Sequence, residues 1–206
     1  MCGKKKDKKQ KTPLREIAEW VLTVVAAVLI ALPIRAFAFE LVRVDGESME
    51  GTLSNGEIMF VAKFDYTTAW LSFPWQDAEA KENAPRLVAG GDPRRFDVVI
   101  CRYPGRGDTD FVKRVVGLPG ETVELMGGYL YVDGVRYEEA YIRDEYRAGP
   151  RNHFGPVTVP EGHYFVLGDH RNNSNDSRTV GPLSRDMIIG RAGTVLYPFG
   201  AIREIK

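Results

Sequence analysis

Ser48 is the first residue in the sequence that could act as a nucleophile. It follows the alternating segment 41–45, which is typical of a β-strand, and it lies between Gly46 and Gly51. A glycine-rich turn at a strand end can expose a hydroxyl and direct backbone N–H groups at one point. Most serines in such turns are structural, however, and a nucleophilic serine needs a base that takes its proton.

Lys113 is the candidate for that base, because it lies within the apolar segment 111–117. A lysine on the inward face of a strand loses hydration, which disfavours the ammonium form and lowers its pKa. A neutral amine could then accept the serine proton. Alternation places Phe111, Lys113 and Val115 on one face. That face could also point to solvent, which would make Lys113 an ordinary surface residue.

A dense polar segment at residues 168–178 follows an apolar strand and could complete the site. Its simplest interpretation is a solvated loop with side-chain-to-backbone turns. A Ser-His-Asp hydrolase that uses Ser48, His170 and Asp169 is an alternative, although a lone histidine more often has a structural role.

The three segments, taken in order, resemble the three boxes of type I signal peptidase, the membrane-anchored serine protease that removes signal peptides. The serine box Ser-Met-x-Pro-Thr-Leu matches residues 48–53, with Gly51 in place of the proline. The lysine box Lys-Arg-x-x-Gly-x-Pro-Gly-[Asp/Glu] matches residues 113–121. The C-terminal box Gly-Asp-Asn-x-x-x-Ser-x-Asp-Ser-Arg matches residues 168–178, with His170 in place of the asparagine.

The resemblance implies a role for each matching residue. Ser48 would be the nucleophile and its backbone amide one oxyanion donor, while Lys113 would be the general base. Ser174 would orient the lysine, and Asp176 and Arg178 would form a structural ion pair beside the site.

The resemblance also implies how substrate binds. An extended peptide would lie between segments 42–46 and 109–113, and narrow apolar pockets would admit only side chains of alanine size. Gly46 stands where some family members have a serine that donates to the oxyanion, so that donor is missing or replaced by backbone. The implied substrate-binding residues are Val42, Val44, Met49, Asp110, Phe111 and Val112.

The N-terminal segment combines a lysine-rich tract with an uncharged run from Trp20 to Ile34, which extends across Arg35 to Phe39. Twenty helical residues span roughly 30 Å, the thickness of a bilayer core. We therefore expect a basic cytoplasmic tail at 1–18, a single transmembrane helix at 19–40 and a β-rich catalytic domain at 41–206 on the outer face of the plasma membrane.

A cleaved signal peptide is an alternative for the same segment, because Ala36-Phe37-Ala38 has the small-x-small form of a cleavage site. Both interpretations export residues 40–206, and they differ only in whether the mature chain keeps its anchor.

The composition narrows the classes of function. The chain of 206 residues is 44% hydrophobic and 27% charged, which is ordinary for a globular protein. Its net charge of zero argues against nucleic-acid binding, but residues 1–35 carry +5 and residues 36–206 carry −5. Two cysteines exclude a disulfide scaffold and a four-cysteine zinc site. Three histidines offer few possible ligands for a metal centre, so we expect no cofactor. We also expect the protein to be a monomer.

Short apolar strands separated by turns predict a mainly β fold, an antiparallel domain like that of signal peptidase. Asp133-Gly134 between two apolar strands predicts a hairpin with a two-residue turn. Residues 65–95 read as an irregular insertion. Its aromatic residues would form a small cluster or a patch resting on the membrane. Strands are expected at 41–45, 58–64, 96–101, 111–116, 129–132, 135–137, 164–167 and 187–197. The cluster or patch would contain the aromatic residues Trp70, Phe73 and Trp75 together with Leu71.

These inferences predict a membrane-bound serine endopeptidase whose partners are signal-peptide-bearing pre-proteins and the lipid bilayer. Two alternatives share its core: a specialised Ser–Lys processing peptidase and a self-cleaving repressor-like protease. A third is a non-catalytic, membrane-tethered β module that binds extended peptides.

Overall fold

The computed structural model describes residues 13–37, 39–63, 65–70, 76–77, 79–80, 83–107 and 109–206. The chain divides into two compact units, Met1–Ala36 and Phe37–Lys206.

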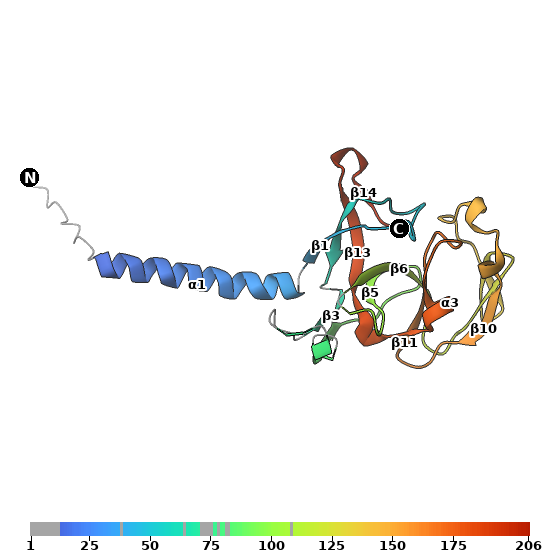
Figure 1. The fold of residues 1–206 in the computed structure, drawn as a ribbon, viewed down its shortest axis with the longest axis horizontal. Helices are drawn as coiled ribbons and strands as arrows, with labels where there is room; N and C mark the ends of the chain where they lie inside the picture. Colours follow the sequence, from blue (N-terminus) through green and yellow to red (C-terminus); the bar gives the residue numbers. More distant parts are fainter. Residues whose placement is uncertain are drawn as a thin grey trace, which may run out of the picture. The chain divides into compact units, whose positions relative to one another are not determined.

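Helix α1 (Pro13–Phe37) accounts for the described part of the first unit (Figure 1). Pro13 suits a first helical turn, because its fixed φ is helical and its missing N–H would have no partner there. Apolar side chains such as Trp20, Leu22 and Leu29 are exposed along the helix. Within the described residues, no helix is both long and apolar enough to cross a membrane. The side chains of residues 32–37 lie outside that description.

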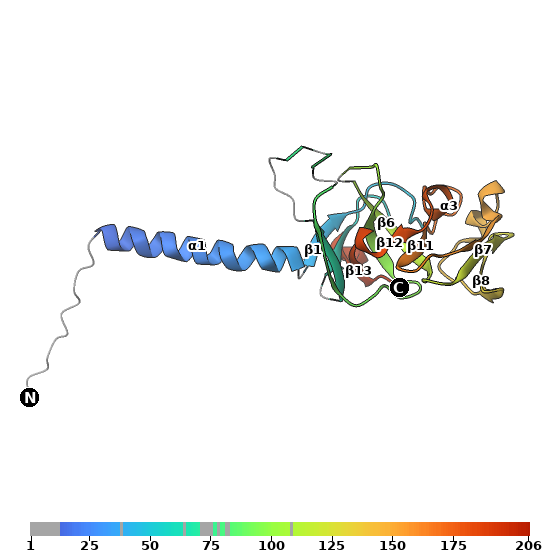
Figure 2. The ribbon, with the colours of Figure 1, turned by 90° about the horizontal axis from the view of Figure 1, so that it is seen from below.

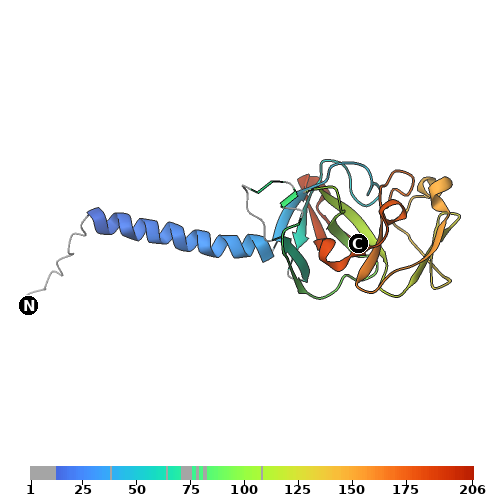
Figure 3. The ribbon, with the colours of Figure 1, turned by 60° about the horizontal axis from the view of Figure 1, so that its bottom comes forward.

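The second unit is built on an eight-stranded antiparallel sheet that curls on itself (Figures 1 and 3). The strand order is β1-β2-β13-β5-β6-β11-β12, and β14 also pairs with β13. The strands are β1 (Phe39–Arg43), β2 (Ile58–Ala62), β5 (Val98–Arg102), β6 (Asp110–Gly117), β11 (His163–Leu167), β12 (Leu183–Ser184), β13 (Ile188–Tyr197) and β14 (Arg203–Glu204).

A smaller four-stranded sheet, in the order β10-β7-β8-β9, lies at the end of this unit away from β1 (Figure 2). Asp133 and Gly134 join β8 to β9 with positive φ values of 52° and 77°, which confirms the predicted hairpin. The sequence did not reveal β7 and β10. Gly155 and Pro156 lie within β10, and such residues argue against a strand unless it is at a sheet edge, as β10 is. The strands are β7 (Thr122–Met126), β8 (Tyr129–Val132), β9 (Val135–Tyr137) and β10 (Phe154–Thr158).

Residues 65–95 contain more regular structure than their composition predicts. Strands β3 (Tyr66–Trp70) and β4 (Arg86–Gly90) pair antiparallel over five residues, and the Thr67 hydroxyl donates to the Ile189 carbonyl of β13 at 2.9 Å. The predicted aromatic cluster or membrane patch falls on the Trp70 side chain and residues 71–75, which lie outside the described residues.

Short helical turns complete the unit. Helix α3 (Ser177–Val180) begins at the end of the polar segment 168–178, and Asp176 caps it by accepting from the Arg178 N–H. The other turns are η1 (Asp144–Tyr146), η2 (Pro150–Asn152), η3 (Arg185–Met187) and η4 (Phe199–Ala201).

The hydrophobic core forms three clusters around β5 and β6. One contains Val44, Met49 and Leu53 from the segment after β1, and it packs against β2, β5 and β13. Lys113 and Arg114 of β6 therefore lie inside the packed domain, where water cannot reach them easily.

Candidate active site

The turn that carries Ser48 is pinned to the core on both sides of the serine. The Val44 N–H donates to the Glu57 carbonyl at 2.8 Å, and the Leu53 N–H donates to the Met49 carbonyl at 2.8 Å. Met49 is only 2% exposed and Leu53 only 1%, so both side chains anchor the turn in the hydrophobic core. The serine therefore occupies a defined position beside β6.

Lys113 lies on β6 and directs its amine at that serine. Its Nζ is 2.8 Å from the Ser48 hydroxyl and 2.8 Å from the Val112 carbonyl. The side chain is 2% exposed, so the solvent-facing alternative is wrong. Burial lowers the pKa of Lys113, and the negative charges of Asp176 and Asp169 oppose this more weakly.

Cys101, on the neighbouring strand β5, does not supply a negative charge to the lysine. It is a free, buried cysteine, and burial raises the pKa of its thiol to about 12. The thiol is therefore neutral at physiological pH, and Lys113 loses hydration without gaining a thiolate partner. This surrounding favours the uncharged amine, which is the form that can take a proton.

Gly168 is the point where the serine turn meets the polar segment 168–178. A Cβ at this position would lie 2.5 Å from the Ser48 carbonyl oxygen and would overlap the Ser174 hydroxyl. The His170 N–H also donates to the Ser48 carbonyl at 3.1 Å. Only glycine allows the backbones of these two segments to approach so closely.

Asp176 and Arg178 form a bidentate ion pair next to this point, with two N–O distances of 2.8 Å. The Asp176 carboxylate also accepts from the Gly168 N–H at 3.0 Å. Burial by itself raises the pKa of Asp176, but the hydrogen bonds and charge of Arg178 outweigh it, and the pKa is lowered. The pair thus fastens the end of the polar segment to its beginning.

The Ser174 hydroxyl is buried in the same place. It has no partner within hydrogen-bonding geometry among the described residues, although it faces Asp176 and helps to lower its pKa. The structure brings Ser174 beside Gly168 and leaves its predicted bond to Lys113 unmade.

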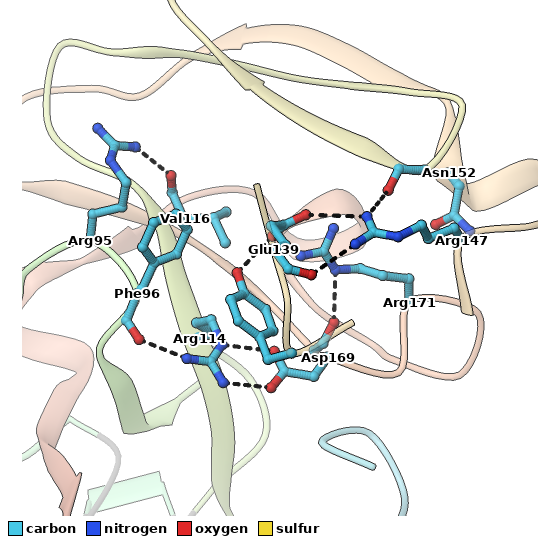
Figure 4. A network of polar contacts seen from close by, with 12 residues as sticks. Arg95, Phe96, Arg114, Val116, Glu139, Arg147, Asn152, Asp169 and Arg171 are labelled. Carbon is cyan, nitrogen blue, oxygen red and sulfur yellow. Dashed lines mark hydrogen bonds and ion pairs between the residues drawn. The ribbon is translucent and has the colours of Figure 1, made fainter. Parts of the chain in front are cut away.

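The sequence analysis assigned no role to Arg114, and it gave Asp169 one only in the Ser-His-Asp alternative. The two residues form a fully buried, bidentate ion pair with N–O distances of 2.7 and 2.9 Å (Figure 4). Thr52, four residues after Ser48, donates its hydroxyl to Asp169 at 2.5 Å. The pair therefore links β6, the serine turn and the polar segment on the side of β6 opposite Lys113.

A second buried pair, Arg171 with Glu139, continues this network (Figure 4). Tyr141 donates its hydroxyl to Glu139 at 2.7 Å, and the Arg114 guanidinium lies 3.8 Å from the Tyr141 ring centroid. Nothing in the local sequence around Glu139 indicates this partnership, because its partner lies thirty-two residues away.

These contacts exclude the Ser-His-Asp alternative. The Asp169 carboxylate binds Arg114 and Thr52, while the His170 ring contacts Glu50 and stacks on Tyr146. The hydroxyl of Ser48 is paired with Lys113 instead.

A pocket of about 180 Å³ opens beside Ser48 and Lys113. Apolar side chains form the larger part of its wall. All six residues predicted to bind substrate line it: Val42, Val44, Met49, Asp110, Phe111 and Val112. In the described part of the chain, no group of three or more His, Cys, Asp or Glu side chains could hold a metal ion.

A buried lysine amine next to a serine hydroxyl, beside a pocket in a mainly β domain, is typical of hydrolases that use a serine nucleophile. The family described as signal peptidase, peptidase S26, matches residues 17–197 of the chain. The chain therefore belongs to the signal peptidase S26 family of peptidases.

Two relatives agree with this assignment in sequence. A signal peptidase I of Bacillus licheniformis is 35% identical over 96% of this chain and 98% of its own length. Signal peptidase I T of Bacillus subtilis is 36% identical over 97% of this chain and 95% of its own length. A crystal structure of a signal peptidase I from Enterococcus faecalis is 37% identical, covering 49% of this chain and 97% of that chain, with a TM-score of 0.42.

Proposed function

We propose that this peptidase is a membrane-bound serine endopeptidase that removes N-terminal signal peptides from exported pre-proteins, with Ser48 as nucleophile and Lys113 as general base. The observation that carries the proposal is the buried Lys113 amine, 2.8 Å from the Ser48 hydroxyl. An unperturbed lysine has a pKa of about 10.4 and is almost wholly protonated at pH 7. The lowered pKa of Lys113 increases the share of neutral base.

The reaction passes through an acyl-enzyme. Neutral Lys113 takes the proton of Ser48 as the serine oxygen bonds to the scissile carbonyl carbon, and the Ser48 backbone N–H stabilises the oxyanion. The lysine then gives its proton to the leaving amine as the C–N bond breaks. Water attacks the ester with the same amine as base, which releases the cleaved signal peptide and restores the serine.

Ser174, Asp176 and Arg178 support this machinery. A rotation of the buried Ser174 hydroxyl would offer Lys113 a hydrogen bond that orients the amine. The Asp176–Arg178 pair holds Ser174 in reach, because it closes the segment in which Ser174 lies.

The substrate binds as an added β-strand. Strand β6 pairs with β11 only from Arg114 onward, so residues 110–113 offer a sheet edge next to the pocket. Main-chain hydrogen bonds along that edge fix an extended peptide, and the pocket selects small side chains before the cut. The occupant is limited by size, since a larger side chain would clash with the apolar walls.

The predicted anchor 19–40 is shortened by the structure, because α1 ends at Phe37 and Phe39 begins β1. The α1 part of this segment, residues 19–37, anchors the enzyme in the plasma membrane, with the N-terminus cytoplasmic and the β domain on the outer face. The exposed apolar side chains of α1 and the lysines before it support this topology. Anchoring confines enzyme and membrane-bound substrate to one surface, which raises their effective concentration.

The test is incubation of the purified full chain, in detergent, with a pre-protein. We expect one shorter product whose new N-terminus follows a small residue. The Ser48→Ala and Lys113→Met variants should yield none. Ser54→Ala, in the same turn, is the matched control and should cleave normally. Binding of the pre-protein by Ser48→Ala without any cleavage by the parent chain would instead favour the non-catalytic peptide-binding module.

A further inference from the structure

Both residues that depart from the signal peptidase boxes lie next to one side chain, that of Glu50. Gly51, in place of proline, directly follows it in the chain. His170, in place of asparagine, comes from the distant polar segment, and its Nδ1 lies 3.3 Å from Glu50 Oε2. The two departures therefore meet in space at the turn that carries the nucleophile.

The backbone at Gly51 explains why this turn needs outside support. Its φ is +103°, a conformation that residues with side chains rarely adopt. Proline cannot occupy it either, because its ring fixes φ near −65°. Glycine permits the conformation but leaves the free turn with more conformational freedom than another residue would. Contacts from outside the turn must then restrict it.

His170 is itself held firmly. Its side chain is 16% exposed, and its ring stacks on Tyr146 with centroids 3.9 Å apart and planes 23° apart. Arg143 approaches the Tyr146 hydroxyl from the other side at 3.4 Å. The buried Nδ1 of this ring makes no hydrogen bond within the described residues. It faces Glu50 as a polar contact at 3.3 Å, and a small shift of the carboxylate would let the fixed ring donate to it.

Glu50 connects the His170 ring to the turn that carries Ser48. Its backbone N–H donates to the Glu47 carbonyl at 3.0 Å, which closes the turn around Ser48. The Glu47 carboxylate in turn accepts from Asn173 at 3.2 Å. The polar segment thus holds the turn on both sides of Ser48, once through Glu47 and once through Glu50.

We propose that His170 is a positioning residue: by holding Glu50 it fixes the Ser48 turn, so that the serine hydroxyl stays within reach of the Lys113 amine. This inference rests on the proposed function, since it concerns the rate of the same reaction. His170 does not touch the serine hydroxyl and transfers no proton in it. Displacing a reacting group by about 1 Å can cost on the order of 100-fold in rate, so a loosened turn lowers kcat more than it raises KM.

The experiment is single-turnover cleavage of a pre-protein, with enzyme in excess, by variants of the full chain. We expect His170→Ala and Glu50→Ala each to slow cleavage about tenfold. We expect the double variant to be no slower than either single one, because both remove the same contact. KM should stay within about twofold of the parent, since the pocket is untouched.

Two controls separate positioning from general stability. His170→Asn keeps a donor nitrogen at the place of Nδ1 and should recover the rate to within about threefold of the parent. His170→Leu fills similar space without a donor and should be as slow as His170→Ala. The reaction amplitude reports the folded, active fraction, so a rate loss at full amplitude is not a loss of folded enzyme. His163→Ala, on the far end of β11, should match the parent.

The outcomes also separate this inference from the proposed function. Cleavage that disappears in Lys113→Met but is unchanged in His170→Ala would overturn the inference alone. Additive rate losses in the double variant, or a slow His170→Asn, would overturn it as well. A parent chain that cleaves no pre-protein would overturn both.

Discussion

The two faces of β6 surround two neighbouring basic side chains with different partners. Lys113 and Arg114 are adjacent and both are buried. Arg114 is neutralised by the Asp169 carboxylate, because a guanidinium stays charged even when it is buried. Lys113 meets a hydroxyl and a carbonyl instead, and burial lowers its pKa. One face therefore holds a paired charge, and the other holds an amine whose pKa is lowered.

Replacing Lys113 by methionine should have the largest effect on activity. Methionine keeps the length of the side chain but cannot take a proton, so we expect kcat/KM to fall by about 10⁴-fold. The thermal midpoint should not fall, because no charge is left unpaired. Steady-state cleavage and thermal unfolding of the same preparation would check both. A variant with substantial activity would show that another group acts as the base.

Replacing Arg114 by methionine should reverse that pattern and act mainly on stability. It leaves the buried Asp169 carboxylate without its partner, so we expect a loss of about 3–5 kcal/mol in the free energy of unfolding. Denaturant unfolding is the measurement.

Two further variants sharpen this result. Adding Asp169→Leu to Arg114→Met should recover much of the loss, because no unpaired charge remains. Arg136→Met, at an exposed arginine, should change stability by less than about 1 kcal/mol. Equal effects at Arg114 and Arg136 would contradict the assignment of a structural charge to the buried face.

Gly168→Ala should weaken the link between the two faces. Its Cβ would press on the Ser48 carbonyl and displace the serine turn, so we expect kcat to fall by about 100-fold. Gly200→Ala is the matched control, since a Cβ there meets open space. An unchanged kcat in Gly168→Ala would mean that the serine turn moves freely without cost to the reaction.

The smallest expected effect is on the pH dependence of stability. Lys113 has a lowered pKa in the folded chain, so between that value and about 10.4 the unfolded chain binds more protons. The parent should therefore gain stability relative to Lys113→Met as pH rises toward 10.4. Denaturant unfolding at several pH values would measure it, and a parent that loses stability relative to Lys113→Met as pH rises would contradict the lowered pKa.

The same titration should govern activity. Cleavage needs the neutral amine, so kcat/KM should rise with pH along a limb that lies below the pKa of an ordinary lysine. That limb should keep its position when His153, His163 and His170 are replaced in turn. A limb that moves with one histidine would assign the base to that residue.

Local signals predicted much of the fold. Asp133-Gly134 specified its hairpin because the turn needs two positive φ values that these residues tolerate. Strand β10 was missed because its Gly-Pro pair is acceptable only at a sheet edge, and edge position is a property of the assembled sheet. Strands β3 and β4 were missed because their pairing joins residues on either side of an irregular segment.

The sequence by itself determined the chemistry: a serine, a lysine in an apolar strand and a polar segment, in an order that resembles one peptidase family. Tertiary structure decided which charges are paired. Lys113 was equally compatible with a solvent-facing strand, and only packing places its amine against Ser48. The partners Arg114 with Asp169, Arg171 with Glu139 and His170 with Glu50 lie far apart in the chain. The physical reason is that desolvation and ion pairing depend on neighbours in space, which a local pattern of residues does not contain.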